Sequence, residues 1–363
     1  MLLHPSQGTR RALVIVLAAL AIPLVAACGG LPAGGWSSPT VTQDTLYYGS
    51  TDGRARALKT DGGAQVWQFP TDSGKTVQAI YSTPAVLGGN LYFGAADKSV
   101  YALDAGTGQQ KWQFKTLGEV VSSPALAGGA LYVGSGDGNL YALDADSGSL
   151  KWQFATGENV WADPLVDNGV VYVGSMSHTA YALDAASGRV IWQQPMSGTI
   201  NAAPVLGDGM LYMSALDTLR ALDPRTGATI WQFKAGNWIW SRPAVTGGVL
   251  YVGSLDDKVY ALDSKTGSKK WELTTGGPVR SGPAVSGGVV YIGSEDKSLY
   301  AIDAATGVRK WAFLTKGKVN SNIVVSSGVV YANSLDGSLY AVNALTGQEL
   351  WKYPPASQGG QTK

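Results

Sequence analysis

Short apolar runs separated by glycine-rich turns follow one another along most of the chain. Residues 122–154, SSPALAGGALYVGSGDGNLYALDADSGSLKWQF, contain four such runs: PAL, LYVGS, LYALD and KWQF. The Gly-Gly, Asp-Gly and Ser-Gly pairs between these runs are typical of tight hairpin turns. The pattern therefore predicts four short antiparallel β-strands in this stretch.

This four-strand unit is repeated eight times. Its last part reads ALDAGTGQQKW at residues 102–112, and related phrases begin at Ala57, Ala142, Ala182, Ala221, Ala261, Ala301 and Ala341. The phrases end on eight tryptophans, which lie 39 or 40 residues apart after a first interval of 45: Trp67, Trp112, Trp152, Trp192, Trp231, Trp271, Trp311 and Trp351. A four-stranded unit of ~40 residues is typical of a β-propeller blade. We therefore predict an all-β fold, an eight-bladed β-propeller of four-stranded antiparallel blades.

The repeated phrase has a structural explanation. One large aromatic side chain per blade would fill the gap between blades near the rim, and the small alanine opposite would leave room for it. The aspartate of each phrase would accept backbone N–H bonds in a turn, and the glycine four residues later would adopt a positive φ. We therefore interpret these tryptophans as structural docking residues and exclude the turn carboxylates as catalytic candidates. Both the first and the last strand of the series are present, so we expect blades one and eight to close the ring by packing, without strand exchange.

The phrase A-x-D-x-x-[ST]-G-x-x-x-W resembles the tryptophan-docking motif of PQQ-like, quinoprotein-type propeller repeats, in eight copies that cover nearly the whole mature chain. Copies one and eight depart from it, with Lys59 and Asn343 in the aspartate column. Two branches of this family are relevant. The compact, lipid-anchored BamB-like assembly proteins are similar in length and in having few insertions, whereas quinoprotein dehydrogenases are longer and hold PQQ with calcium, a catalytic Asp and often a vicinal disulfide.

Composition narrows the possible chemistry. The chain has 363 residues, 27 basic against 26 acidic side chains, two histidines and one cysteine. A balanced charge provides no electrostatic attraction for nucleic acid, and so few histidines and cysteines exclude zinc clusters and an internal disulfide. His178 is interpreted as an exposed loop residue.

The first 27 residues have the pattern of an export signal. Arg10 and Arg11 precede an apolar run, residues 12–27, which is shorter than the ~20 residues of a spanning helix and contains Pro23. Small residues before Cys28 resemble a bacterial lipobox, which predicts lipidation of that cysteine. We expect a signal peptide at 1–27, a glycine-rich tether at 28–35, the propeller at 36–354 and a disordered tail at 355–363. Export by Sec is the default, although TRRALVI partly resembles a twin-arginine signal.

Candidate binding residues lie where the copies differ. A proline column precedes the first strand of seven units, from Pro39 to Pro283, with Ile323 in the eighth place. Residues one and three positions before this column should lie at the mouth of the central channel, and many of them are aromatic, amide or charged. The candidates are Trp36, Tyr81, Trp161, Asp163, Asn201, Trp240, Arg242, Arg280, Asn320 and Asn322.

These features favour a non-catalytic scaffold or binding module over an enzyme. Cys28 is alone and cannot form a vicinal disulfide, and Asp163 is almost the only carboxylate among the mouth positions. We expect no metal and no cofactor, a monomeric propeller, an envelope or membrane protein partner, and anchoring to a bacterial membrane through Cys28. The anchor would lie on the periplasmic side of an outer membrane or on the outer face of the cytoplasmic membrane. Two alternatives stay open: a PQQ-dependent dehydrogenase with calcium, and a receptor for a sugar or polymer at the mouth.

Overall fold

The computed structural model describes residues 37–72 and 74–354, which belong to one compact unit. All the regular secondary structure in these ranges consists of β-strands. The signal segment, Cys28, the tether, Trp36 and the C-terminal tail lie outside the described residues. Within the described ranges, no helix has the length and apolar character needed to span a membrane.

The first four blades follow one another along the chain. Their strands are β1 (Thr40–Val41), β2 (Thr45–Gly49), β3 (Ala55–Lys59), β4 (Gln65–Phe69), β5 (Ala85–Leu87), β6 (Asn90–Ala95), β7 (Ser99–Asp104), β8 (Gln110–Lys115), β9 (Ala125–Ala127), β10 (Ala130–Gly134), β11 (Asn139–Asp144), β12 (Leu150–Ala155), β13 (Leu165–Asp167), β14 (Val170–Gly174), β15 (Thr179–Asp184) and β16 (Val190–Pro195).

The last four blades repeat this arrangement. Their strands are β17 (Val205–Gly207), β18 (Met210–Ala215), β19 (Thr218–Leu222), β20 (Thr229–Lys234), β21 (Ala244–Thr246), β22 (Val249–Gly253), β23 (Lys258–Asp263), β24 (Lys269–Thr274), β25 (Ala284–Ser286), β26 (Val289–Gly293), β27 (Ser298–Asp303), β28 (Arg309–Leu314), β29 (Val324–Ser326), β30 (Val329–Asn333), β31 (Leu339–Asn343) and β32 (Glu349–Tyr353).

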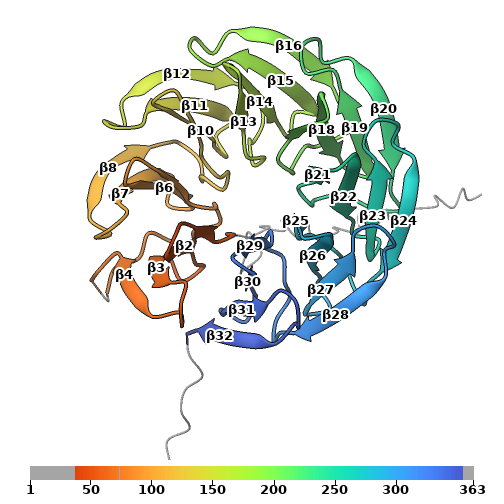
Figure 1. The fold of residues 1–363 in the computed structure, drawn as a ribbon. Helices are drawn as coiled ribbons and strands as arrows, with labels where there is room; N and C mark the ends of the chain where they lie inside the picture. Colours follow the sequence, from red (N-terminus) through yellow and green to blue (C-terminus); the bar gives the residue numbers. More distant parts are fainter. Residues whose placement is uncertain (1–36, 73, 355–363) are drawn as a thin grey trace, which may run out of the picture. The chain divides into compact units, whose positions relative to one another are not determined.

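The sheets form an eight-bladed propeller. Each sheet contains four strands in sequence order, such as β9-β10-β11-β12, and all neighbours are antiparallel. The first strand of each blade lies nearest the centre of the ring and the fourth lies at the rim (Figure 1). The predicted fold class is therefore confirmed.

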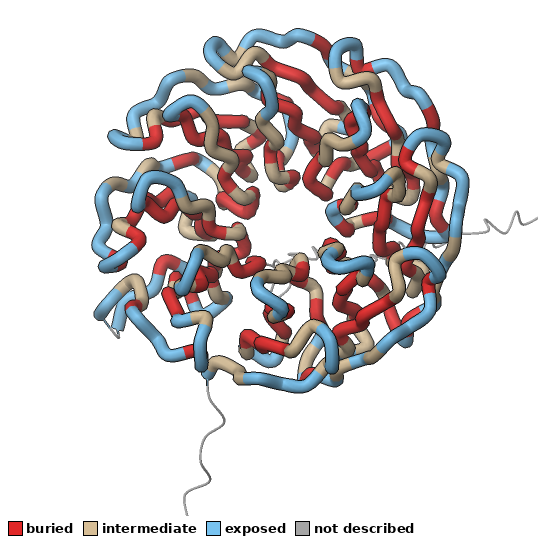
Figure 2. The backbone as a smooth tube through the Cα atoms, viewed as in Figure 1, coloured by how far each residue is buried: buried red, intermediate tan, exposed pale blue. Residues whose placement is uncertain are grey.

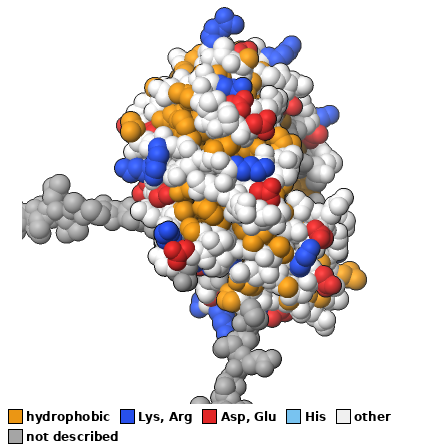
Figure 3. Space-filling model, turned by 90° about the vertical axis from the view of Figure 1, so that its left-hand side faces the viewer, with side chains coloured by type: hydrophobic (Ala, Val, Ile, Leu, Met, Phe, Trp, Pro, Cys, Tyr) orange, Lys and Arg blue, Asp and Glu red, His pale blue; other side chains and the backbone are white. Residues whose placement is uncertain are grey.

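Burial follows this arrangement. The second and third strands of each blade are buried on both faces, as in β10, because each blade packs against a neighbour on either side. The fourth strand alternates between exposed and partly buried residues, as in β12. Figure 2 shows the buried backbone inside the ring and the exposed backbone along its rim. On the side of the molecule drawn in Figure 3, basic and acidic side chains are interspersed, in agreement with the balanced composition.

Each repeat tryptophan docks onto the next blade. Trp112 Nε1 donates to the carbonyl oxygen of Ala145 at 3.0 Å, and the indole lies against Gly148. Gly148 has a φ of 72°, which favours glycine. A Cβ at this position would also lie 2.6 Å from the indole, so any other residue would clash with the tryptophan. We call the five residues from the aspartate to the glycine, here 144–148, the docking turn. The tryptophan's partner, the docking turn of the following blade, was not predicted from the sequence.

The ring closes as predicted. Blade one uses only β1–β4 and blade eight only β29–β32, so no strand is exchanged. Trp351 Nε1 of blade eight donates to the carbonyl oxygen of Thr60 in blade one at 3.1 Å, and Leu46 of blade one packs with Tyr331 of blade eight. Asn343 replaces the usual aspartate and still accepts N–H bonds from Leu345 and Thr346.

Candidate binding site at the channel mouth

Nine of the ten predicted mouth residues line one pocket, which we call the mouth pocket. Its volume is about 100 Å³, and it adjoins a central channel of about 590 Å³ with which it shares six lining residues. The tenth candidate, Trp36, lies outside the described residues. The pocket is lined by Tyr81, Thr83, Val121, Ser123, Trp161, Asp163, Asn201, Ala202, Ala203, Trp240, Arg242, Arg280, Asn320 and Asn322.

The path of the chain explains this convergence. After each rim strand the chain crosses back to the axis, as between β12, which ends at Ala155, and β13, which begins at Leu165. Trp161 and Asp163 lie on this connection, just before Pro164 and the innermost strand. Equivalent connections of neighbouring blades meet around the axis, so residues 40 positions apart in the sequence become neighbours in space.

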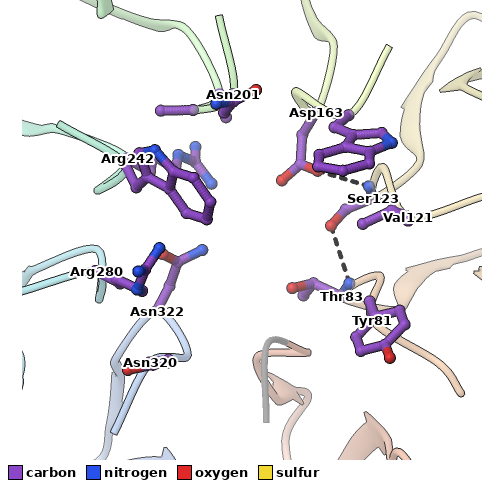
Figure 4. A pocket seen from close by; sticks show the side chains of 14 residues that line it. Tyr81, Thr83, Val121, Ser123, Asp163, Asn201, Arg242, Arg280, Asn320 and Asn322 are labelled. Carbon is purple, nitrogen blue, oxygen red and sulfur yellow. Dashed lines mark hydrogen bonds between the residues drawn. The ribbon is translucent and has the colours of Figure 1, made fainter. Parts of the chain in front are cut away.

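A partial ring of hydrogen bonds surrounds the axis. The residue before the proline column donates its backbone N–H to the side chain of its counterpart in the next blade. These bonds run from Ser38 to Thr83 Oγ1 at 3.1 Å, from Thr83 to Ser123 Oγ at 2.9 Å, from Ser123 to Asp163 Oδ1 at 2.6 Å and from Gly282 to Asn322 Oδ1 at 2.9 Å. Figure 4 shows two of them on the wall opposite Arg242.

This ring is interrupted between blades four and seven, and once more between blades eight and one, where the buried Ser38 Oγ has no partner among the described residues. Ala203 and Gly282 have no side-chain acceptor, and Arg242 carries only donors. The backbone N–H groups of Asp163, Ala203 and Arg242 therefore meet no side-chain acceptor in the corresponding position. The mouth has one wall whose polar groups are joined to one another and one wall with donors left for other partners.

Asp163 faces Arg242 across the pocket (Figure 4). Burial raises the pKa of Asp163, and the N–H of Ser123 and the positive charge of Arg242 partly oppose this effect. The two opposite charges share one small cavity.

The carboxylate of Glu295 holds Arg280 in place. Glu295 forms ion pairs with both Arg280 and Lys318. Burial alone would raise the pKa of Glu295, but the hydrogen bonds from Lys318 and Arg280 outweigh it and keep the pKa below its usual value. The Arg280 guanidinium lies 4.2 Å from the ring centre of Trp240, within cation–π range.

Two contributors were missed by the sequence analysis. Trp238 stacks on Trp240, with ring centres 6.3 Å apart and planes 18° apart, and remains 44% exposed. Glu295 lies in a hairpin turn between the second and third strands of blade seven, where seven copies have a residue without a carboxylate. The one acidic residue in this column could have indicated a special role for Glu295. Its contact with Arg280, however, depends on how the segments of the blade pack together.

The mouth pocket does not fit PQQ held with calcium. Calcium binds six to eight oxygen ligands and favours several carboxylates. Asp163 is the one carboxylate among the residues that line the pocket, and the described residues contain no group of three His, Cys, Asp or Glu side chains placed to hold a metal ion. The aspartates of the docking turns lie on separate blades, each bonded within its own turn.

Comparisons with known proteins agree with this architecture. The fold is similar to the crystal structure of BamB from Moraxella catarrhalis, with a TM-score of 0.71, 23% identity and coverage of 83% of this chain and 92% of that one. It is also similar to the computationally designed protein Ika8, with a TM-score of 0.75, 16% identity and coverage of 85% and 96%. No curated protein sequence matches. The family described as outer membrane protein assembly factor BamB matches residues 26–160, 155–219 and 215–363, so the chain belongs to this family.

Proposed function

We propose that this protein is an exported, lipid-anchored and non-catalytic scaffold that captures an envelope protein at the mouth of its propeller. Membership of the BamB family supports a role of this kind. The observation that carries it is the cluster of Trp238, Trp240 and Arg280 at the mouth, which combines an exposed aromatic surface with a fixed cation.

Tryptophan and arginine are the side chains most enriched among residues that dominate binding energy at protein interfaces. The tryptophan ring provides a large contact area on only two rotatable bonds, and the planar guanidinium of arginine is pre-organised, so less entropy is lost for each hydrogen bond that it forms. Glu295 already orients the Arg280 guanidinium, and the stacked rings of Trp238 and Trp240 support each other. These side chains are therefore already held in place in the free protein, so less conformational entropy is lost when a partner binds, and the affinity is higher.

The proposal includes no cofactor, because the mouth pocket lacks the carboxylates of a calcium-dependent quinoprotein site. It includes an envelope location, which is consistent with the BamB family and with the signal and lipobox pattern at residues 1–28. The assembly role further requires a host with an outer membrane.

Crosslinking and affinity capture from native membranes test the proposal. We expect Trp161→Ala combined with Arg280→Ala to reduce partner capture at least tenfold, because the double variant removes two mouth anchors while leaving the strands intact. Arg225→Ala is a suitable control, since Arg225 lies on an exposed docking turn far along the blade from the mouth.

Both variants should keep the circular dichroism of the parent. Undiminished capture by the double variant would show that the partner binds elsewhere. Redox turnover by the purified protein supplied with PQQ and calcium would contradict the non-catalytic assignment.

A further inference from the structure

We propose that the mouth pocket binds a neutral saccharide unit, with Asn201, Asn320 and Arg242 as its polar contacts. The polar contacts of this binding differ from the cluster of Trp238, Trp240 and Arg280 proposed for protein capture, although Trp240 belongs to both. A saccharide is favoured by three properties of the pocket: unmet acceptors, available donors beside aromatic side chains, and balanced charge.

Unmet acceptors are the first property. The side-chain oxygens of Asn201 and Asn320 are buried, and neither has a hydrogen-bond partner within the described part of the chain. Both residues line the mouth pocket. Buried polar atoms are normally paired, so two amide oxygens without a partner, on residues that line one cavity, indicate that a ligand or solvent completes them.

Available donors are the second property. The interrupted part of the hydrogen-bond ring leaves the N–H groups of Ala203 and Arg242 without the side-chain acceptor that Ser38 and Thr83 have. The Arg242 guanidinium adds further donors directed into the pocket (Figure 4). A sugar hydroxyl both donates and accepts, so it can bond to the amide oxygens and to these N–H groups. Trp161 and Trp240 also line the cavity and provide flat apolar surfaces for the C–H face of a sugar ring.

Balanced charge is the third property, and it distinguishes a neutral sugar from an anion or cation. Each charged side chain that lines the pocket has a counter-charge: Asp163 faces Arg242 across it, and Arg280 is paired with Glu295, whose second partner, Lys318, is exposed to solvent. A carboxylate or phosphate ligand would approach Arg242 only in the presence of the Asp163 charge, which repels it. An ammonium ligand would meet the two arginines. A ligand without net charge avoids both costs.

Titration of the purified full-length protein with trisaccharides tests this inference. Suitable probes are the trimers of glucose, mannose, galactose and N-acetylglucosamine as neutral sugars, with trigalacturonate as an acidic probe and the glucosamine trimer as a basic one. We expect at least one neutral trimer to bind with a dissociation constant below 1 mM and to change tryptophan fluorescence, because tryptophans line the pocket. The charged trimers should bind at least tenfold more weakly.

Variants then locate the binding. Asn201→Ala with Asn320→Ala should weaken binding of the neutral trimer at least tenfold, and so should Arg242→Gln. The matched control is Gln109→Ala with Gln348→Ala, which removes two exposed side-chain amides outside the pocket and should leave binding unchanged. The Arg242→Gln variant keeps the inference testable if the double asparagine variant fails to fold.

The inference is overturned if no neutral trimer binds at 10 mM, if a charged trimer binds more tightly, or if the pocket variants bind like the control. Capture of the protein partner by the same asparagine variant is measured in parallel. Loss of sugar binding by the asparagine variant with intact capture supports a saccharide site that is distinct from the capture surface. Because Trp161 lines the saccharide pocket, the Trp161 and Arg280 variant tests protein capture and does not separate the two functions.

Discussion

Each docking tryptophan fills the space between two blades and also donates a hydrogen bond across the gap. Trp231 is 9% exposed, donates to the carbonyl oxygen of Ser264 at 2.9 Å and lies against Gly267 of the next blade. The repeated glycine and the repeated tryptophan are therefore the two sides of one contact between neighbouring blades. His178, by contrast, lies exposed at a hairpin tip with a φ of 62°.

Trp231→Ala should lower the free energy of unfolding by about 3–5 kcal/mol, because the substitution removes a buried aromatic side chain and leaves a cavity between blades. His178→Ala should stay within about 0.5 kcal/mol of the parent, since the side chain is exposed and lies on a hairpin tip. Chemical denaturation measures both values. Similar losses in the two variants would refute the docking assignment.

The positions of the tryptophan and of the turn residues could be predicted from the sequence, but the contact between them could not. The repeat period indicated the position of every tryptophan in its blade. The residue types typical of turns indicated the positions of the aspartates and glycines, because each blade contains the same turn. The contact between Trp231 and the following blade could not be predicted in the same way, since it depends on how neighbouring sheets are stacked.

The docking turn is stabilised as a unit by its carboxylate. Asp144 accepts backbone N–H bonds from Asp146 and Ser147, and its ion pair with Lys151 adds to this. The hydrogen bonds from Ser147 and the charge of Lys151 lower the pKa of Asp144 to about 2, and similar contacts with Thr306 and Lys310 lower that of Asp303 to about 2. Blade eight shows that the charge is dispensable, because Asn343 makes the same backbone bonds.

These lowered pKa values predict a pH dependence with a definite sign. An unfolded aspartate has a pKa of about 3.9, so the turns contribute their full electrostatic stability above about pH 4 and lose it as the pH falls toward 2. Asp144→Asn with Asp303→Asn should therefore reduce the loss of thermal stability between pH 5 and pH 2, while keeping the fold. Melting curves at a series of pH values, for the parent and the double variant, measure the difference. Parallel curves would mean that other carboxylates control acid unfolding.

Most of the mouth pocket could be predicted from the sequence. Columns that are uniform among the blades indicated packing, and columns that vary indicated the mouth, so nine of ten candidates line one pocket. Glu295 was missed because its role depends on Arg280 and Lys318, which come from other segments. Trp238 was missed although it lies only two residues before Trp240 on which it stacks, because it falls outside the two columns that were compared. The hydrogen-bond ring was also not anticipated, because it joins residues of adjacent blades that have no relation along the chain other than the repeat period.

At the scale of the whole molecule, the described residues close the propeller ring by themselves. The ring is closed by contacts between blades one and eight, such as those of Trp351 with Thr60 and of Asn333 with Ser37, which all lie within residues 37–354. Cys28 precedes the first strand by 12 positions, at the end of an apolar run that follows two arginines. An anchor at this position would restrict where the propeller is found without being required for its folding.

Cys28→Ala should therefore change location and leave the fold unchanged. If Cys28 carries the lipid, the variant should leave the membrane fraction or accumulate with its signal segment uncut, because a thiol at the cleavage site is the acceptor of the lipid. The detergent-solubilised parent and the variant should have the same melting temperature, since the ring is complete from Thr40 to Tyr353. Membrane fractionation with mass spectrometry of the N-terminal peptide tests this. Unchanged membrane association of the variant, with no lipid on Cys28 of the parent, would show that the protein is held at the membrane by a partner or is not anchored through this residue.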